Sequence, residues 1–202
     1  APDVVQDNLE EVSALKIRIK FRKWGVMKFI GHLDMMRYFQ KAVRRAKIDI
    51  RYSEGYSPHQ IMSFAAPLGV GITSDGEYFD IEVNESMTSE EAVAALNETM
   101  VDGVEVTSYV KLPDKAKTAM SIVAAADYRL SYKEGYESPF SMEEWKRIVK
   151  ERFWDSPQFT IIKKTKKSER EVDLKPLGIC LFRRRGTGTS GIFPAGFYRQ
   201  CG

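Results

Sequence analysis

Residues 30–48 read IGHLDMMRYFQKAVRRAKI, and this stretch decides how the chain around it is organised. Its apolar residues recur every three to four positions, which predicts a helix over about residues 32–47 with one face in a core. Four cations at positions i, i+4, i+7 and i+8 form one basic edge of that helix: Arg37, Lys41, Arg44 and Arg45.

The segments on both sides of this helix show the alternation of apolar and polar residues that is typical of strands. LKIRIKFRKW at 15–24 places apolar residues on one face and Lys or Arg on the other. A short strand is expected at 48–53, and EYFDIEV at 77–83 alternates again. The first domain therefore begins with the order β-α-β-β.

A second helix and a fourth strand follow. Thr88 and Glu91 form a capping box, which predicts a helix that ends near Met100. VEVTSYVKL at 104–112 has the periodicity of a strand. The order β-α-β-β-α-β over residues 15–112 is that of a ferredoxin-like domain, in which two helices cover one face of a four-stranded antiparallel sheet. The predicted fold class is α+β.

The order β-α-β-β is expected again in the second half of the chain, as an incomplete second ferredoxin-like half. Its helix opens with a capping box formed by Ser141 and Glu144. Its strands are expected at 124–133, 158–167 and 170–177. The predicted parts of the chain are a tail at 1–14, a ferredoxin-like domain at 15–113, the second half at 114–177 and an irregular tail, rich in Gly and Arg, at 178–202.

Several classes of protein are excluded by what the sequence lacks. No run of about 18 apolar residues occurs, so we expect no membrane span. The first residues lack the order of a signal peptide, so the default location is the cytoplasm. Cys180 and Cys201 are too few for a disulfide framework, a zinc signature or an iron–sulfur cluster, and we expect neither metal nor cofactor. Nucleotide-binding glycine motifs are missing as well.

The net charge of +3 conceals a strong polarity. Residues 16–60 carry 12 Lys or Arg against three Asp or Glu, whereas residues 61–110 carry ten Asp or Glu and no Lys or Arg. Either the two halves neutralise each other across a shared sheet, or one basic face serves a polyanion and one acidic face serves another partner. A basic hairpin, which is either a solvated tip or an extension of the basic face, is formed by Lys163, Lys164, Lys166, Lys167 and Arg170.

The catalytic candidates are His32, Asp34 and His59, which include both histidines of the chain. Their spacing commits none of them to a reaction, because His32 and Asp34 lie two positions apart and do not share a helix face. Asp34 fits the first turn of a helix, where the dipole favours a carboxylate, and His32 fits a cap or a ligand contact. No third nitrogen or sulfur ligand accompanies them, so no metal site is expected.

The loop YSEGYSPH at 52–59 interleaves aromatic and hydroxyl residues close to the basic helix edge. Rings that stack on bases, beside cations that bind phosphates, are the chemistry of single-stranded nucleic acid recognition. The alternative is that Tyr52 and Tyr56 pack on the sheet. The nucleic-acid-binding candidates are Arg37, Lys41, Arg44, Arg45, Tyr52, Ser53, Tyr56 and His59.

The same region resembles the radical-SAM-linked family of bacterial proteins, a family of unassigned function. The resemblance begins at His32-Leu-Asp34-x-x-Arg37 and Arg44-Arg45-Ala46, continues through the loop at 52–59, and covers about residues 15–177. Its further motif residues are Gly55, Pro58, Ser63, Phe64, Pro67, Gly71, Ser74, Glu77, Tyr78 and Asp80. REVDLKPL at 170–177 resembles the signature of the second half. The chain departs from the family at Gln60 and Gly69, where the family usually has proline.

The resemblance implies a partner of a radical-SAM protein, because the chain lacks the three cysteines that would hold a cluster itself. The first hypothesis is an RNA-binding accessory protein that acts with a radical-SAM enzyme on tRNA or rRNA. The second is an RNA-processing or modifying enzyme that uses His32, Asp34 and His59. The third is a protein–protein docking domain without RNA contact. The oligomeric state stays open.

Overall fold

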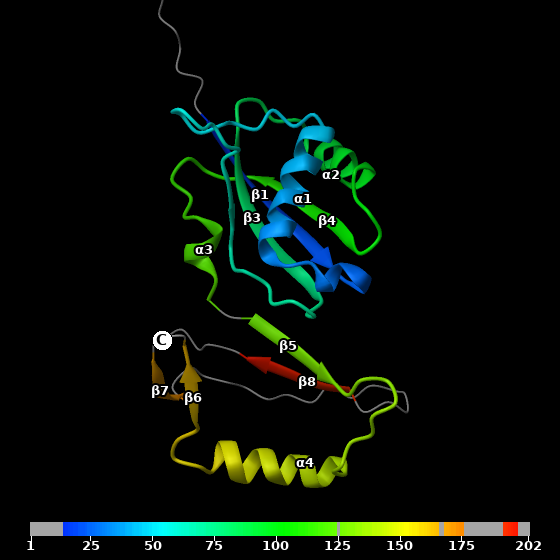
Figure 1. Cartoon of the computed structure of the whole chain (residues 1–202), viewed down its shortest axis with the longest axis vertical. Helices are drawn as coiled ribbons and strands as arrows, with labels where there is room; N and C mark the ends of the chain where they lie inside the picture. The colour runs from blue at the N-terminus through cyan, green and yellow to red at the C-terminus, as the bar shows by residue number, and fades with distance from the viewer. Residues whose placement is uncertain (1–13, 125, 166–167, 176–191, 198–202) are drawn as a thin grey trace, which may run out of the picture. The chain divides into compact units, whose positions relative to one another are not determined.

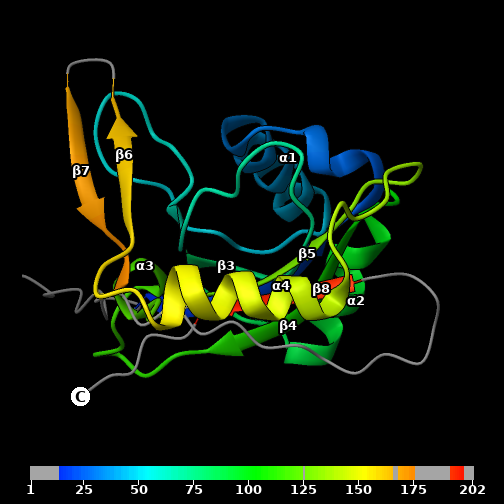
Figure 2. The ribbon, with the colours of Figure 1, turned by 90° about the horizontal axis from the view of Figure 1, so that it is seen from below.

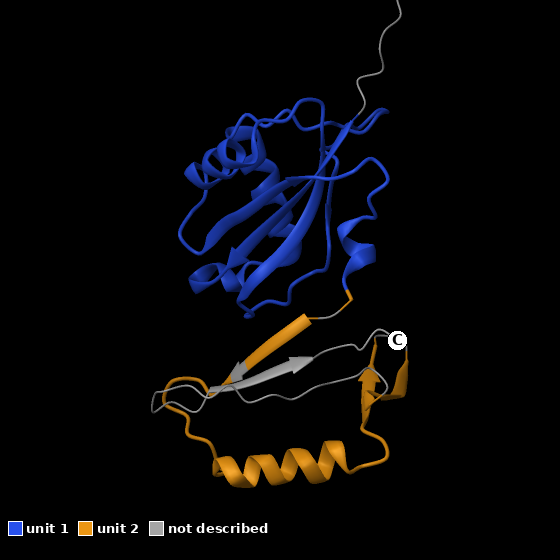
Figure 3. Cartoon of the chain, turned by 180° about the vertical axis from the view of Figure 1, so that it is seen from behind, with its two compact units in different colours: residues 1–123 blue, residues 124–202 orange. Residues whose placement is uncertain are grey.

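The computed structural model describes residues 14–124, 126–165, 168–175 and 192–197. The chain forms two compact units, residues 1–123 and residues 124–202 (Figure 3). Most of the predicted N-terminal tail lies outside the described residues. So do Cys180, Cys201, Lys166 and Lys167, and the last two residues of the REVDLKPL motif.

Unit 1 is built on a four-stranded antiparallel sheet with the strand order β2-β3-β1-β4 (Figure 1). Its main helices are α1 and α2, and seen from below α1 lies on one side of the ribbons of β1, β3 and β4 (Figure 2). The elements are β1 (Leu15–Lys23), η1 (Gly25–Phe29), α1 (His32–Arg45), β2 (Met62–Phe64), β3 (Ser74–Val83), α2 (Ser89–Glu98), β4 (Val104–Lys111) and α3 (Ala119–Ile122). The predicted α+β class, with its four-stranded antiparallel sheet and helices, is confirmed.

The central strand β1 explains how the sheet and the helices meet. It pairs with β3 and with β4, and its alternation places Ile17, Ile19 and Phe21 in the core. The rings of Phe39 on α1 and Phe21 are 4.6 Å apart, and those of Phe39 and Phe79 are 4.7 Å apart. Phe64 stacks on Phe79 at 4.9 Å. This aromatic cluster attaches α1 to the sheet.

The predicted boundaries of α1 and of the strand after it differ slightly from the observed ones. The helix ends at Arg45 rather than near residue 47, because Lys47 adopts a left-handed conformation with φ 56°. The strand expected at 48–53 is reduced to two isolated bridges, which join Ile50 to Val83 and Tyr52 to Gln60. The segment still follows the edge of β3, so the predicted chain path is retained.

The capping box predicted for α2 is present. Thr88 Oγ1 accepts a hydrogen bond from the Glu91 N–H at 3.3 Å, and the Glu91 carboxylate accepts one from the Thr88 N–H at 3.1 Å. The Thr88 hydroxyl also donates to the Glu91 carboxylate at 2.8 Å, and this bond, together with the one from the Thr88 N–H, holds the pKa of Glu91 below its usual value.

Residues 114–123, which were expected to begin the second half, lie in unit 1. Arg18 on β1 forms a two-pronged ion pair with Asp80 on β3, at 2.8 and 3.0 Å. Asp80 also accepts a hydrogen bond from the Ala119 N–H at 2.6 Å, and Arg18 donates to the Lys117 carbonyl oxygen at 2.9 Å. Asp80 and Arg18 therefore tie the start of α3 to the sheet.

Unit 2 contains the predicted β-α-β-β elements, but they do not form one sheet. The elements are β5 (Ala126–Ser131), α4 (Met142–Val149), η2 (Lys150–Trp154), β6 (Thr160–Lys164), β7 (Glu169–Asp173) and β8 (Ile192–Phe197). Two separate two-stranded sheets form, β5 with β8 and β6 with β7. The expectation of a wholly irregular tail at 178–202 is therefore wrong at β8, which pairs with β5 along its whole length. The capping box predicted at Ser141 is present.

No helix in the described part of the chain is long and apolar enough to span a bilayer.

Truncating the aromatic side chain that attaches α1 to the sheet tests this description of the core. Phe39 is 0% exposed, and Phe39→Ala should lower the free energy of unfolding by about 3–5 kcal/mol. Leu33 on the same helix is 62% exposed, and Leu33→Ala should cost less than about 0.5 kcal/mol. Urea unfolding of the full chain, followed by circular dichroism, measures both. Equal costs would contradict the packing.

Candidate nucleic-acid interface

The basic edge of α1 faces solvent. Arg37, Lys41 and Arg44 are all exposed, as the predicted helical spacing requires. Arg37 lies 3.1 Å from Asp34 in an ion pair whose side chains are about two-thirds exposed, at 68% and 67%. Such a pair contributes only about 0–1 kcal/mol, so it leaves Arg37 available to a ligand. Arg45 turns toward α2 and donates to the Thr99 carbonyl oxygen at 3.4 Å.

The cations of β1 behave differently from those of α1. Arg18 pairs with Asp80 on β3, and Arg22 lies 3.2 Å from both Asp75 and Glu105. The acidic half of the sequence therefore neutralises part of the basic half across the shared sheet, as the first interpretation of the charge polarity expected. This neutralisation does not reach the exposed cations of α1.

The loop at 52–59 is closed by reciprocal hydrogen bonds between Ser53 and His59. The Ser53 N–H donates to the His59 carbonyl oxygen at 2.8 Å, and the His59 N–H donates to Ser53 Oγ at 3.1 Å. The imidazole Nδ1 of His59 lies 2.7 Å from the same Oγ. Gly55 has φ 106°, a conformation that disfavours any side chain. Ser53 and His59 thus shape the loop, and Pro58 is exposed on it.

The two tyrosines of this loop do not pack in the core. Tyr56 is fully exposed, and Tyr52 is 49% exposed. Gln60 donates through Nε2 to the Tyr52 hydroxyl at 3.3 Å. Gln60 is itself buried, and within the described residues its Oε1 has no hydrogen-bond partner. The alternative in which both rings pack on the sheet therefore fails for Tyr56, whose ring is free to stack on a ligand.

His32 and His59 are not brought together. The His32 ring stands edge-on to Phe64 with centroids 5.3 Å apart, whereas His59 contacts Ser53. Phe64 pairs with Phe79 on β3, and the chain from Phe64 back to His59 spans roughly 16 Å when extended, so the residue that His32 contacts lies well away from His59. The loop after α1 lies at the opposite end of unit 1 from η1 (Figure 1). The described residues contain no cluster of three or more His, Cys, Asp or Glu suited to a metal.

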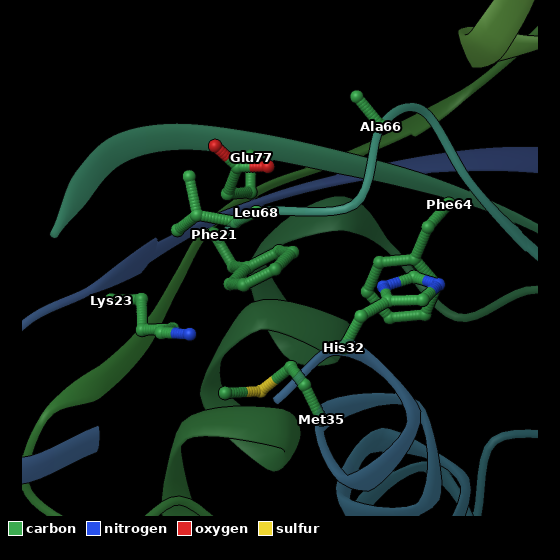
Figure 4. Close-up of a pocket in the computed structure, with 8 residues that line it drawn as sticks. All are labelled: Phe21, Lys23, His32, Met35, Phe64, Ala66, Leu68 and Glu77. Atoms are coloured by element: carbon green, nitrogen blue, oxygen red, sulfur yellow. The ribbon is translucent and has the colours of Figure 1, made fainter. Parts of the chain in front are cut away.

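His32 lies instead in a small hollow at the start of α1 (Figure 4). Its lining combines aromatic and apolar side chains with one cation and one carboxylate: Phe21, Lys23, His32, Met35, Phe64, Ala66, Leu68 and Glu77. The hollow has a volume of about 10 Å³, which is room for about one water molecule.

Two charged side chains in this hollow have shifted pKa values. Lys23 is 2% exposed and donates to the Ile30 carbonyl oxygen at 2.8 Å, and burial lowers the pKa of its ammonium group. Burial raises the pKa of Glu77, while the hydrogen bond that Ser74 Oγ donates to Glu77 Oε1 at 2.7 Å opposes this rise. Shifted titratable groups gathered in a hollow are typical of functional sites.

Lys23 was missed as a site residue, although a signal for it exists in the sequence. The alternation of 15–24 places position 23 on the same side of the strand as Phe21, so a cation there interrupts the apolar face. The strand pattern therefore contains one core-facing lysine, which is a rare placement for an unpaired charge.

The remaining motif residues have structural surroundings. Tyr78 lies under the Lys20 ammonium at 5.7 Å from its ring centroid, and Ser63 on β2 lies opposite Asp80. Pro67 and Gly71 belong to the exposed segment between β2 and β3. Gly71 has φ 87° and donates its N–H to the Lys28 carbonyl oxygen at 2.8 Å. None of these contacts by itself indicates a reaction.

The basic hairpin lies in unit 2, where only part of it is described. Lys163, Lys164 and Arg170 are exposed on β6 and β7. Lys164 pairs with Glu169 at 2.8 Å. Exposed positions and a partly neutralised charge are what a solvated tip requires, and they also leave Lys163 and Arg170 accessible to a polyanion.

A comparison with models of known families matches residues 16–187 to a family described as "Uncharacterized protein conserved in bacteria (DUF2344)". A search of curated proteins finds no match.

The pH dependence of stability tests the burial of Glu77. The carboxyl group has a pKa of about 4.3 when unfolded and a higher pKa when folded, so its stabilising contribution is full below the unfolded value and is lost as the pH rises through the folded value. The free energy of unfolding of the parent, relative to Glu77→Gln, should therefore fall as the pH rises from about 4 to 7. Urea unfolding at a series of pH values measures this.

The amide of Glu77→Gln is a suitable reference because it still accepts from Ser74 and does not titrate. Ser74→Ala removes the bond that lowers the pKa of Glu77, so the fall should move to higher pH. A difference that stays constant with pH would show that Glu77 is solvated.

Proposed function

Since the chain belongs to the bacterial family DUF2344, we propose for it a function that suits a conserved bacterial protein with a basic surface: it is an RNA-binding accessory protein that acts with a radical-SAM enzyme on tRNA or rRNA. The observation that carries the RNA-binding part is the row of exposed cations on α1. Arg37, Lys41 and Arg44 extend over about 10 Å of one helix face. Phosphate contacts from such a row supply affinity that depends on salt.

The loop at 52–59 supplies the second part of the proposed interface. Tyr56 is fully exposed and Tyr52 is about half exposed, so both rings are accessible to bases. Ser53 and His59 close the loop and limit its freedom, which lowers the entropy that binding must offset. In this proposal the cations bind the backbone and the rings stack on bases.

We propose that unit 1 is a ferredoxin-like domain. The observed order of elements, β1-α1-β2-β3-α2-β4, and the strand order β2-β3-β1-β4 are those expected from two interleaved βαβ units. Unit 2 is proposed to be an incomplete half of the same kind, because it has the β-α-β-β order. The proposal that the partner is a radical-SAM enzyme rests on the resemblance of the motif residues to those of the radical-SAM-linked family.

A docking domain without RNA contact is the second candidate, and one observation favours it. Large apolar side chains are exposed around the start of α1: Val26, Phe29, Leu33, Val70 and Ile72. Gly71 is hydrogen-bonded to Lys28, so the segment that carries Val70 and Ile72 lies beside η1. Exposed apolar groups of this kind mark protein contacts. An RNA-modifying enzyme that uses His32, Asp34 and His59 has no comparable support, since the two histidines have separate surroundings.

Removing the cations of α1 tests the proposal. The triple variant Arg37→Ala, Lys41→Ala, Arg44→Ala should bind single-stranded RNA and tRNA at least about tenfold more weakly at low salt, and the slope of log K against log salt should shrink by about two. Fluorescence anisotropy at a series of KCl concentrations measures both quantities. The control Lys111→Ala, Lys115→Ala, Lys117→Ala removes three exposed charges elsewhere in unit 1. If both triple variants lose affinity equally, α1 is not the interface.

Stacking by the loop is tested separately. Tyr56→Ala should weaken RNA binding by about 1–3 kcal/mol with an unchanged salt slope, because a ring is lost and no charge is removed. Tyr136→Ala removes another exposed ring, in unit 2, and should have no effect. Anisotropy titrations of both variants measure this, and equal affinities for the parent and Tyr56→Ala would remove the loop from the interface.

A further inference from the structure

Lys23 has hydrogen-bonding capacity that the fold does not use. An ammonium group has three N–H donors, and the hydrogen bond to the Ile30 carbonyl oxygen uses one of them. The structure records no ion pair between Lys23 and Glu77 in the part of the chain it describes. A buried charge that is incompletely hydrogen-bonded costs stability, and a ligand that accepts from Lys23 would recover part of that cost.

Glu77 offers the complementary group on the same side of the hollow. Its Oε1 accepts from Ser74 Oγ at 2.7 Å, and no described residue donates to its Oε2. Lys23 and Glu77 lie to one side of the Phe21 ring, while His32 and Phe64 lie to the other (Figure 4). A ligand in the hollow would therefore meet a donor and an acceptor along one edge.

The other walls of the hollow suit a planar ring. His32 and Phe64 lie edge to face with an interplanar angle of 90°, and Phe21 lies 6.0 Å from Phe64. Met35 and Leu68 complete the apolar lining. Aromatic and apolar walls, with polar groups at one edge, are how proteins hold an extruded base.

The hollow as it stands holds about one water, so a base would displace the segment that carries Ala66 and Leu68. That segment, residues 66–73, contains no helix or strand and is mostly exposed. Among the described backbone contacts, one hydrogen bond ties it to η1, from Gly71 N–H to Lys28 at 2.8 Å. Its outward movement therefore breaks few bonds.

We propose that the hollow at the start of α1 binds a guanine base of the RNA; this rests on the proposed RNA-binding function and names a base that the site selects. Guanine presents O6 as an acceptor beside two donors, N1–H and the N2 amino group. Lys23 donates to O6, and the Glu77 carboxylate accepts from the two donors. Adenine presents an amino donor where guanine has O6, and cytosine and uracil present only one donor beside an acceptor.

The test uses the full chain and uridine-rich single-stranded RNAs that carry one guanine, adenine, cytosine or inosine. The parent should bind the guanine strand about tenfold more tightly than the adenine strand. A difference of this size is expected when two side chains hydrogen-bond to one base and not to the other. Inosine, which lacks the N2 amino group, should bind with intermediate affinity. Lys23→Met and Glu77→Gln should bind all strands equally, and thermal unfolding verifies that both variants fold.

Arg44→Ala is the matched control, because it should weaken binding to all strands by the same factor and keep the preference for guanine. A parent that binds RNA without any preference among the four strands overturns the guanine pocket and leaves the proposed function standing. A preference that survives in both Lys23→Met and Glu77→Gln also overturns it.

A second measurement separates the pocket from RNA binding as a whole. The chain has two histidines, so their NMR signals report on the hollow through His32 and on the loop through His59. Free guanosine should shift the His32 signals in the parent, leave those of His59 unchanged, and have no effect in Lys23→Met. If no RNA binds but guanosine shifts His32, the proposed function fails and the pocket stands. An unshifted His32 refutes the pocket.

Discussion

The pairing of β1 with both β3 and β4 is the constraint on which the rest of unit 1 depends. Because successive side chains of a strand point to opposite faces, this pairing puts Ile17, Ile19 and Phe21 into the core and turns most cations of the strand, among them Arg18 and Arg22, to the other face. A slip of one residue would bury those cations and expose the core. With β1 in place, Phe39 of α1 packs against Phe21 and Phe79 of the sheet. The hollow lies at the start of α1 and the tyrosine loop follows its end, so the two lie at opposite ends of unit 1.

This arrangement divides the positive charge of the first half of the chain into two groups. The cations on β1 meet carboxylates of β3 and β4, as in the ion pairs of Arg18 with Asp80 and of Arg22 with Glu105. The cations on α1 lie outside the sheet and stay exposed. The average charge of +3 therefore underestimates the local potential along α1, where Asp34 is the one carboxylate among the described residues that forms an ion pair with the row of cations. A polyanion is the ligand that such a row suits.

The hollow at the start of α1 is the place where unit 1 departs from the rules of a stable core. Lys23 occupies a core-facing position of β1 and Glu77 lies near it on β3, and burial disfavours the charged form of both groups. An apolar pair of the same size would avoid this cost. Local departures of this kind are expected where a site is built into a fold, since a ligand supplies the interactions that the folded chain leaves unmade.

Local patterns determined much of the outline of this protein. The alternation in β1, the periodicity of α1 and the capping boxes at Thr88 and Ser141 involve residues within a few positions of one another, so the sequence alone predicts them. The closure of the loop by Ser53 and His59, the attachment of α3 by Asp80 and the pairing of β5 with β8 were decided only by the tertiary structure. The tertiary structure also decided that Lys23 and Glu77 line the same hollow. Contacts between distant segments depend on the register of the strands, and no short sequence window contains that information.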